Sequence, residues 1–286
     1  MRVVLCLALV ITVAWCTELV VDEFGPDDAP VRIMIVCGLH PRESITRDVC
    51  GEWVKMLRQR PPVAMHIVVV ADANPEGVIR WRQDACWRGN DRGVDLNRNW
   101  PPIPCEPPAD EGDYVPAFAE REWSHGTDPM SEWETRALDQ LMRRVQPHLL
   151  LAIHSGLEAF LTPFDACARS PINYHDHVKL GKWLRRGVCD QCVVARSPRL
   201  LYYSRGTMTD YAYHFLGVPM VFTVEIFEGP EPATASDCTT LFSPPPRTIA
   251  YTQTIRRWRN LMARLLDMAS DDYVALLEMV GVVEAS

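Results

Sequence analysis

Val31-Arg32-Ile33-Met34-Ile35-Val36 is an almost uninterrupted apolar run, and Gly38-Leu39-His40-Pro41-Arg42-Glu43 follows it after a single cysteine. Such a run is typical of a strand that is covered on both faces of a parallel sheet. The second stretch places an imidazole and a carboxylate three positions apart, where both can reach one ion from a turn or a first helical turn. Nitrogen and carboxylate oxygen suit Zn²⁺, which usually takes three protein ligands in catalytic sites. The pattern predicts a zinc site at the end of a buried strand, with a third ligand elsewhere.

A helix and a second strand are predicted next along the chain. Between Glu43 and the prolines at 61 and 62, apolar residues recur at near-helical spacing, at Ile45, Val49, Trp53 and Leu57. The run from Ile67 to Val70 then repeats the buried-strand pattern. Strand, helix and strand in this order predict a parallel βαβ unit.

The remaining chain continues this alternation. Residues 72–110 are rich in turn formers, and we expect a long irregular loop there. A capping box at Ser131 to Glu134 predicts the start of the next helix. Further strands are expected over 149–153 and 218–224, and further helices over 174–186, 207–216 and 249–268. We therefore expect an α/β fold with a mixed, mainly parallel sheet and helices on both faces.

Length and composition suit one large domain. The chain has 286 residues, of which 48% are hydrophobic, and we assign residues 17–286 to a single catalytic domain with an extended C-terminal helical tail. The net charge is −8 and no basic run of five or more occurs, so the electrostatic footprint of nucleic-acid binding is missing. We expect a monomer that binds no nucleic acid.

The N-terminus has the pattern of a secretory signal peptide over residues 1–16. Arg2 gives a positive start, Val3 to Trp15 is almost wholly apolar, and small residues precede a cleavage point after Cys16. A buried first strand and an uncleaved anchor are the alternatives. No later stretch is long enough to span a membrane, so no stable span is expected after cleavage. We expect a secreted protein, or one in the lumen of the secretory pathway or of a lysosome-like compartment.

Eight cysteines remain once Cys6 and Cys16 are removed with the signal. An even number suits an oxidising compartment, although the connectivity cannot be derived from sequence. Cys189 and Cys192 form a CxxC pair that could be a redox or structural-metal motif. Because no partner pair exists, we expect disulfides from this motif to other parts of the chain.

Three candidate functional side chains come at the ends of three separate apolar runs. His40, His154 and Glu225 follow the runs at 31–36, 149–153 and 218–224. The carboxyl ends of parallel strands meet at one edge of a sheet, where functional groups gather. His154 therefore supplies the missing third ligand, and Glu225 is placed to act as general base on a water at the metal.

Each of these residues also has an ordinary structural interpretation. His154 alone would be a hydrogen-bonded core histidine, and Glu225 alone a strand-end ion pair. The spacing of His40 and Glu43 is repeated by His125 and Asp128, as chance allows in a chain with eight histidines. The coincidence of three strand ends favours the metal site.

A series of longer motifs resembles one enzyme family in residue type and in order. The motifs are Gly38-Leu-His40-Pro-Arg-Glu43, Asn74-Pro-Glu-Gly77, Cys86-Trp-Arg88, Gly93-Val-Asp95-Leu-Asn97-Arg98-Asn99-Trp100, Ala152-Ile-His154-Ser155, Tyr202 with Gly206-Thr-Met-Thr-Asp210-Tyr211, and Phe222-Thr-Val-Glu225. They cover roughly residues 31–228, and the motif at 93–100 is unusually specific. The chain thus resembles the zinc metallocarboxypeptidase family typified by pancreatic carboxypeptidase A, peptidase family M14.

The resemblance implies a ligand set and a reaction. His40, Glu43 and His154 would hold one Zn²⁺ per chain, and Asp95 would orient His40 from behind. Glu225 would be the general base for hydrolysis of a C-terminal peptide bond, and zinc would activate the water.

The resemblance also implies the residues that hold the substrate. Arg88 would stabilise the charge on the carbonyl oxygen, and Asn97 with Arg98 would clamp the terminal carboxylate. Tyr202 would close over the bound end, although the adjacent Tyr203 leaves this alignment open by one position. The expected partner is therefore the C-terminus of a peptide or protein.

One pocket position predicts the substrate preference, and two departures from the family pattern predict differences in the cleft and in the sheet. Thr209 would face the pocket for the C-terminal side chain, and this neutral residue favours neutral or hydrophobic ends over lysine or arginine. Gly156 stands where the family often has a tyrosine and predicts a wider cleft. The segment before His40 is short, so the resemblance implies an N-terminally shortened sheet.

Two other functions remain open from the sequence. A zinc amidohydrolase with the same core would act on a small acyl amino acid or a cell-wall peptide. A non-catalytic binding homologue is the second alternative, although such a protein is expected to lose a ligand or the base, and none is lost here.

Overall fold

The computed structural model describes residues 2–3, 18–108, 124–230 and 238–271. Eight strands form one sheet in the order β1-β2-β4-β3-β5-β8-β6-β7. The strands are β1 (Arg2–Val3), β2 (Val21–Phe24), β3 (Val31–Val36), β4 (Met65–Val70), β5 (Leu149–His154), β6 (Glu158–Thr162), β7 (Val193–Arg196) and β8 (Met220–Ile226). The helices are α1 (Ser44–Gln59), α2 (Pro75–Trp81), α3 (Trp133–Val145), α4 (Tyr174–Arg185), α5 (Met208–His214), α6 (Cys238–Leu241) and α7 (Ile249–Asp271), with a 3₁₀ turn at Ser197–Arg199.

The centre of the sheet is parallel, as the apolar runs predict. Strands β4, β3, β5 and β8 are parallel neighbours, whereas β2 and β6 pair antiparallel with β4 and β8. The predicted βαβ unit is formed by β3, α1 and β4. In the register of β5 with β8, His154 lies opposite Glu225. Two residues of the predicted site are therefore brought together by strand pairing alone.

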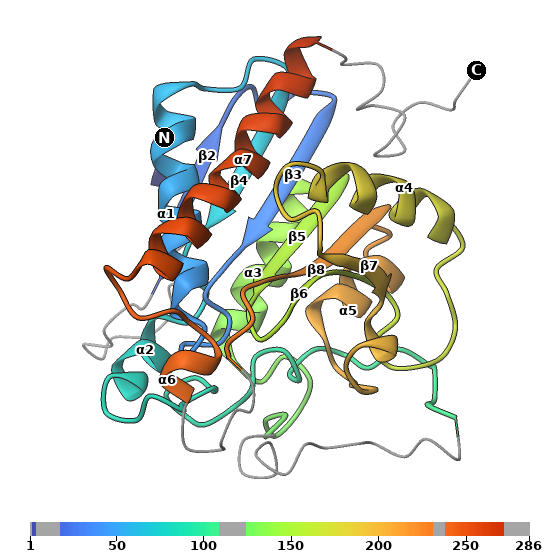
Figure 1. The fold of residues 1–286 in the computed structure, drawn as a ribbon. Helices are drawn as coiled ribbons and strands as arrows, with labels where there is room; N and C mark the ends of the chain where they lie inside the picture. Colours follow the sequence, from blue (N-terminus) through green and yellow to red (C-terminus); the bar gives the residue numbers. More distant parts are fainter. Residues whose placement is uncertain (1, 4–17, 109–123, 231–237, 272–286) are drawn as a thin grey trace, which may run out of the picture.

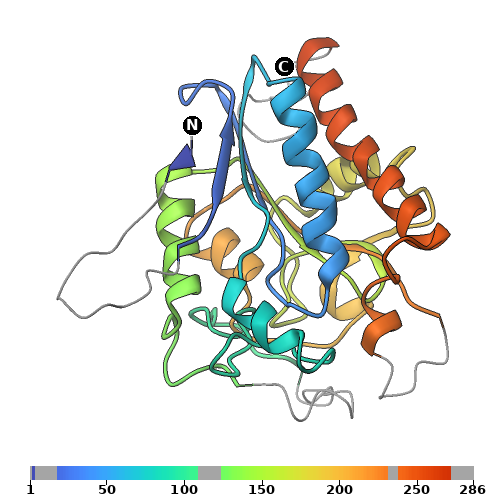
Figure 2. The same ribbon diagram turned by 90° about the vertical axis from the view of Figure 1, so that its left-hand side faces the viewer.

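Helices cover both faces of the sheet (Figures 1 and 2). Helices α1, α4 and α7 share one hydrophobic core with alternate residues of β3 such as Ile33 and Ile35. Helices α3 and α5 pack on the opposite face with Met34 and Val36. Because successive side chains of a strand point to opposite faces, an apolar run can serve both cores.

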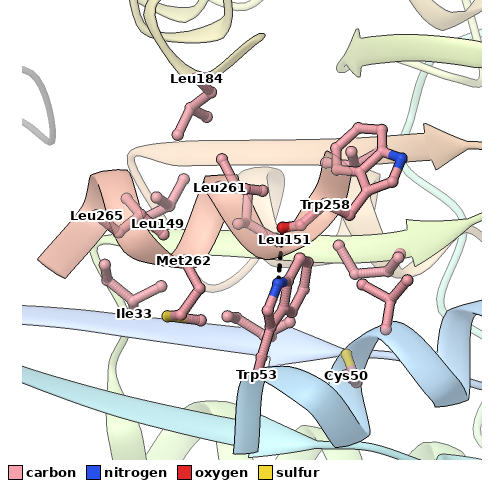
Figure 3. Close-up of a cluster of buried hydrophobic side chains, with 14 of the residues drawn as sticks. Ile33, Cys50, Trp53, Leu149, Leu151, Leu184, Trp258, Leu261, Met262 and Leu265 are labelled. Atoms are coloured by element: carbon pink, nitrogen blue, oxygen red, sulfur yellow. Dashed lines mark hydrogen bonds between the residues drawn. The ribbon is translucent and has the colours of Figure 1, made fainter. Parts of the chain in front are cut away.

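The C-terminal helix belongs to the first of these cores. Trp53 of α1 donates a hydrogen bond from Nε1 to the carbonyl oxygen of Trp258 in α7 at 2.8 Å (Figure 3). The Trp258 indole in turn donates to the carbonyl of Ile226 at 2.8 Å. Both tryptophans are fully buried. Helix α7 thus connects α1 to the strand residue that follows Glu225.

Two local predictions are corrected. Residues 72–110 are not wholly irregular, because α2 lies within them. Asn74 caps this helix by accepting a hydrogen bond from the amide of Gly77, and Pro75 occupies the first helical turn, a combination typical of helix starts. The capping box at Ser131 is also wrong: α3 begins after Glu132 without a side-chain cap, because the Ser131 hydroxyl donates to the Glu132 carboxylate instead.

Strands β6 and β7 were not expected, and the CxxC prediction is wrong. Cys189 and Cys192 form a disulfide with each other. The other three disulfides are Cys37–Cys50, Cys86–Cys238 and Cys105–Cys167. All eight cysteines outside the predicted signal are therefore paired.

Several predicted segments lie outside the described residues. Of the predicted signal peptide, only Arg2–Val3 is described, and it pairs with β2. Most of the proline-rich part of the predicted loop and the turns after α7 are not described either. Within the described part of the chain, no helix combines the length and apolar character needed to cross a membrane.

Replacing Trp258 tests the contribution of α7 to the core. We expect Trp258→Ala to lower the free energy of unfolding by about 3–5 kcal/mol, the usual range for a large buried aromatic. Ile249→Ala on the same helix is the control, since Ile249 is 78% exposed and its loss should change stability by less than about 0.5 kcal/mol. Denaturant unfolding followed by fluorescence measures both. A Trp258→Ala variant as stable as the parent would contradict the packing of α7 against the core.

Candidate metal centre and active site

The three predicted ligands converge at the carboxyl edge of the sheet. His40 lies in the turn after β3, Glu43 immediately precedes α1, and His154 ends β5. The Nδ1 atom of His40 is 2.7 Å from Glu43 Oε1, and the Nδ1 atom of His154 is 3.0 Å from Glu43 Oε2. The two Nδ1 atoms are 3.2 Å apart. All three side chains are buried.

These separations suit a tetrahedral ion. Two ligands bound at about 2.0–2.1 Å with tetrahedral angles stand about 3.3 Å apart. The three ligand atoms lie within 4.8 Å of one another, so one cation can contact all of them. The donor set of two imidazole nitrogens and one carboxylate is that of catalytic zinc sites. Residues and geometry therefore fit a zinc ion.

The charge on Glu43 is stabilised by its surroundings. Burial alone would raise the pKa of the Glu43 carboxyl, but the imidazoles of His40 and His154 hold this pKa well below its usual value. The amide of Ser155 also donates to Glu43 Oε2 at 3.1 Å. An ionised carboxylate in a buried site attracts a cation.

Asp95 lies behind His40, as the motif comparison implied. Its Oδ1 atom is 3.0 Å from His40 Nε2, and its Oδ2 atom accepts a hydrogen bond from Arg88 Nε at 2.7 Å. Burial would raise the pKa of Asp95, but Arg88 and His40 hold it well below its usual value. A carboxylate at Nε2 fixes the ring so that Nδ1 faces the metal position.

Glu225 and Arg88 flank the ligand group. Both line the same cleft, of about 350 Å³, as the three ligands. Burial, together with the neighbouring Glu43 carboxylate, raises the pKa of Glu225 to about 8. Its Oε2 atom is buried and has no hydrogen-bond partner among the described residues. An unsatisfied carboxylate oxygen beside a metal position is arranged to bind a water or a substrate proton.

The predicted carboxylate clamp lies in the same cleft. Asn97 is held by the amide of Met208, which donates to its Oδ1 at 3.0 Å. Arg98 donates from Nη2 to the Tyr202 hydroxyl at 3.2 Å. Tyr202 lines the cleft, whereas Tyr203 lines a neighbouring cavity. Of the two tyrosines, Tyr202 is therefore the one that shares the cleft with the ligand group.

Thr209, which was predicted to face the pocket for the C-terminal side chain, is not among the residues that line the cleft. Thr209 is buried, and its hydroxyl donates to the carboxylate of Asp165 at 2.8 Å. Asp165 itself lines the cleft, and none of the ion pairs found among the described residues involves it. Burial and Asp165 together raise the pKa of the adjacent Asp210 well above its usual value. Asp165 follows β6, a strand that sequence patterns missed, so nothing in the sequence pointed to it.

Gly156 lies beside Phe242, which comes from the segment after α6. A Cβ atom built on Gly156 would lie 3.4 Å from Cε1 of Phe242 and 3.9 Å from Oε2 of Glu225, which are ordinary van der Waals contacts. The wider cleft expected at Gly156 stays a prediction. His125 and Asp128, which repeat the ligand spacing, are exposed.

Comparison with known proteins places this site in a family. A family model described as zinc carboxypeptidase matches residues 26–257. The chain belongs to the zinc carboxypeptidase family. The family is zinc-dependent, and His40, Glu43 and His154 form a group that could hold such an ion.

Relatives of this zinc carboxypeptidase chain include both peptidases and an amidase. Human carboxypeptidase O is 27% identical over 226 residues, which are 70% of this chain and 59% of the relative. Murein peptide amidase A of Escherichia coli K12 is 34% identical over 159 residues, covering 53% of this chain and 55% of the relative. The chain thus spans less than two thirds of the length of these relatives.

Solved structures confirm the zinc carboxypeptidase fold. Carboxypeptidase A from Helicoverpa armigera matches with a TM-score of 0.68 at 20% identity, over 90% of this chain and 67% of that one. Thrombin-activatable fibrinolysis inhibitor matches with a TM-score of 0.67 at 18% identity, over 88% of this chain and 67% of that one. At these identities the likeness concerns the fold alone.

Removing the carboxylate behind His40 tests the metal centre. We expect Asp95→Asn to weaken Zn²⁺ binding by about 10–100-fold, because the amide orients the imidazole less strongly and leaves it less basic. Competition with a chromogenic chelator measures the affinity. Glu52→Gln, which replaces a helix carboxylate paired with Lys55 outside the site, is the control and should bind as the parent does. Unchanged affinity in Asp95→Asn would count against this arrangement.

Proposed function

We propose that the protein is a zinc carboxypeptidase that hydrolyses the C-terminal peptide bond of peptides or proteins, with one Zn²⁺ per chain. The observation that carries the proposal is the common cleft, which is lined by the ligand group, by Glu225 and by the Asn97 and Arg98 clamp. When bound, zinc supplies a Lewis acid that acidifies water and polarises the carbonyl. Side chains of the protein would carry out proton transfer, charge stabilisation and substrate binding.

Glu225 is the proposed general base. Its carboxylate would take a proton from the attacking water and pass it to the leaving amine, a task typically worth about 10²–10⁴-fold in rate. Arg88 is the proposed donor to the oxygen on which negative charge develops. Asp95 orients its guanidinium through the 2.7 Å hydrogen bond from Nε, and Nη1 lies 3.7 Å from Oε1 of Glu43, so the guanidinium faces the proposed metal position.

Asn97, Arg98 and Tyr202 are the proposed binding residues for the terminal carboxylate. A guanidinium presents parallel donors to a carboxylate, and Arg98 already donates a hydrogen bond to the hydroxyl of Tyr202, which supports a shared role for the two side chains. Anchoring the free end places the last peptide bond beside Glu225. Because the anchored carboxylate fixes which bond lies next to Glu225, the last peptide bond is cleaved and internal bonds are not.

We further propose that the released residue is basic. A preference for neutral or hydrophobic ends was inferred from Thr209 alone, but the Asp165 carboxylate lies in contact with it. A buried carboxylate without a charged partner is costly, and an incoming lysine or arginine side chain would neutralise it. Arg205, which could favour acidic ends, is instead paired with Glu106 outside the cleft.

Location and assembly are proposals as well. The four disulfides support an extracellular or lumenal protein, because such bonds persist in oxidising compartments. The signal peptide and the monomeric state remain predictions.

Replacing Glu225 tests the reaction. We expect Glu225→Gln to lower release of C-terminal residues by at least about 10²-fold while Zn²⁺ binding is retained, since the amide cannot accept the proton. Glu228→Gln, an exposed position three residues on, should keep full activity. Amino-acid release from a mixed peptide panel, with and without a chelator, is measured. A zinc-loaded parent that releases nothing would instead favour the amidohydrolase or the binding homologue.

Replacing Asp165 tests the specificity. We expect Asp165→Asn to lower kcat/KM for peptides ending in lysine or arginine by about 10²-fold and to leave leucine ends within threefold, because the amide keeps the contact with Thr209 but loses the charge. Asp176→Asn on the exposed face of α4 is the matched control. Equal losses on all peptides would show that Asp165 is structural and would contradict the preference.

A further inference from the structure

A cluster of one imidazole and two carboxylates lies at the opposite edge of the sheet from the active site. Glu23 belongs to β2, Asp27 lies in the turn after this strand, and His66 lies at the start of β4. Because β4 runs parallel to β3, His66 lies near the amino end of the central strands, whereas His40 follows their carboxyl end. The cluster takes no part in the proposed reaction and needs a separate explanation.

Strand pairing brings Glu23 and His66 together. Strands β2 and β4 are antiparallel neighbours, and Glu23 pairs with Val68, so His66 occupies a diagonal position on the same face of the sheet (Figure 1). Side chains at diagonal positions are within reach of each other when they are long. The strand register alone therefore places the Glu23 carboxylate beside the imidazole.

The turn after β2 brings the second carboxylate to the same place. Gly25 has a φ of +84°, and a Cβ atom there would overlap the carbonyl oxygen of Met65. Glycine is therefore required for the turn to lie this close to the start of β4. The turn places Asp27 next to His66, with 89% of the Asp27 side chain exposed to solvent.

The three side chains have the separations of ligands around one ion. The Nε2 atom of His66 is 3.3 Å from Oε2 of Glu23 and 3.7 Å from Oδ1 of Asp27. All three ligand atoms lie within 4.8 Å of one another. Ligands bound to Zn²⁺ at about 2.0–2.1 Å with tetrahedral angles stand about 3.3 Å apart, so one ion fits between these atoms. The fourth position would be open to water.

The imidazole faces both carboxylates but makes a hydrogen bond to neither. His66 is 3% exposed, and its buried Nε2 atom has no hydrogen-bond partner among the described residues. A protonated imidazole would direct its N–H at one of the carboxylate oxygens. A buried nitrogen without a partner is uncommon, and its position between two carboxylates indicates a place for a cation.

The neighbouring cations leave room for a metal ion. Arg144 of α3 donates to Oε1 of Glu23 at 2.6 Å and, over a longer 3.2 Å, to Oε2. Metal binding at Oε2 would replace only the longer contact, and the shorter one would still orient the carboxylate. Arg32 pairs with His66 in the sheet, but its Nε donates to the last carbonyl oxygens of α3 instead.

We propose that Glu23, Asp27 and His66 form a second zinc site, which connects the turn after β2 to β4. One nitrogen and two carboxylate oxygens suit Zn²⁺, whereas Ca²⁺ and Mg²⁺ prefer oxygen ligands alone. Because the three ligands come together only in the folded chain, the bound ion stabilises the fold. The inference is independent of the proposed peptidase reaction, since none of the three residues lines the active-site cleft.

The test uses the full chain with His154→Ala, which removes a ligand of the catalytic group so that the remaining binding reports the second site. Zinc bound per chain and the melting temperature are measured at micromolar free Zn²⁺ set by a metal buffer. We expect this background to bind one ion and to melt higher than in chelator. Asp27→Asn should weaken binding at least about tenfold, because losing a charged ligand costs no less than losing a residue behind one. Asp28→Asn is the matched control, since this neighbouring carboxylate is exposed and lies outside the cluster, and it should bind as the background does.

The paired variants separate a specific site from adventitious binding. Equal affinity in Asp27→Asn and Asp28→Asn, or a background that binds no ion, would overturn the second site. If His154→Ala failed to fold, the same two variants are compared in the parent chain, where Asp27→Asn should lose the weaker of two bound ions and Asp28→Asn should keep both. Two ions in both of these variants would likewise refute the inference. A parent that holds the ion dependent on Asp27 but releases no amino acid would contradict the proposed function alone.

Discussion

The whole active site depends on a buried negative charge between two imidazoles. Glu43 offers one oxygen to His40 and the other to His154, and its pKa is held low by them. Such an arrangement is stable when a cation lies between the three side chains, because burying an unpaired carboxylate has a large desolvation cost. The parallel sheet brings the two histidines together, because the neighbouring strands β3 and β5 both end at the same edge.

The surroundings of that charge divide the cleft into regions of different chemistry. Asp95 and Arg88 form an ionic layer behind His40, and Glu225 lies opposite with one oxygen left unsatisfied. The cleft is also lined by the Asp165 carboxylate and by apolar side chains that include Leu157 and Phe242.

Sequence patterns were most informative where one strand carries both packing and chemistry. The runs before His40, His154 and Glu225 are apolar because both faces of β3, β5 and β8 are covered, so each strand and the functional residue that follows or ends it could be recognised together. Asp165 and Phe242 could not be found in this way. The first follows the short strand β6, and the second reaches the site only because a disulfide and helix α7 return the C-terminal part of the chain to the cleft. Their position depends on tertiary packing, which local periodicity does not encode.

The disulfide Cys86–Cys238 also encloses most of the active site in a covalent ring of the chain. Its two cysteines are 152 residues apart, and both His154 and Glu225 lie between them. A single proteolytic cut anywhere inside this ring leaves the two pieces linked through sulfur. A chain cut once on a surface loop inside this ring would still keep His154, Glu225 and Phe242 in one molecule. Such nicking would be visible only after reduction, as two bands in place of one on a denaturing gel.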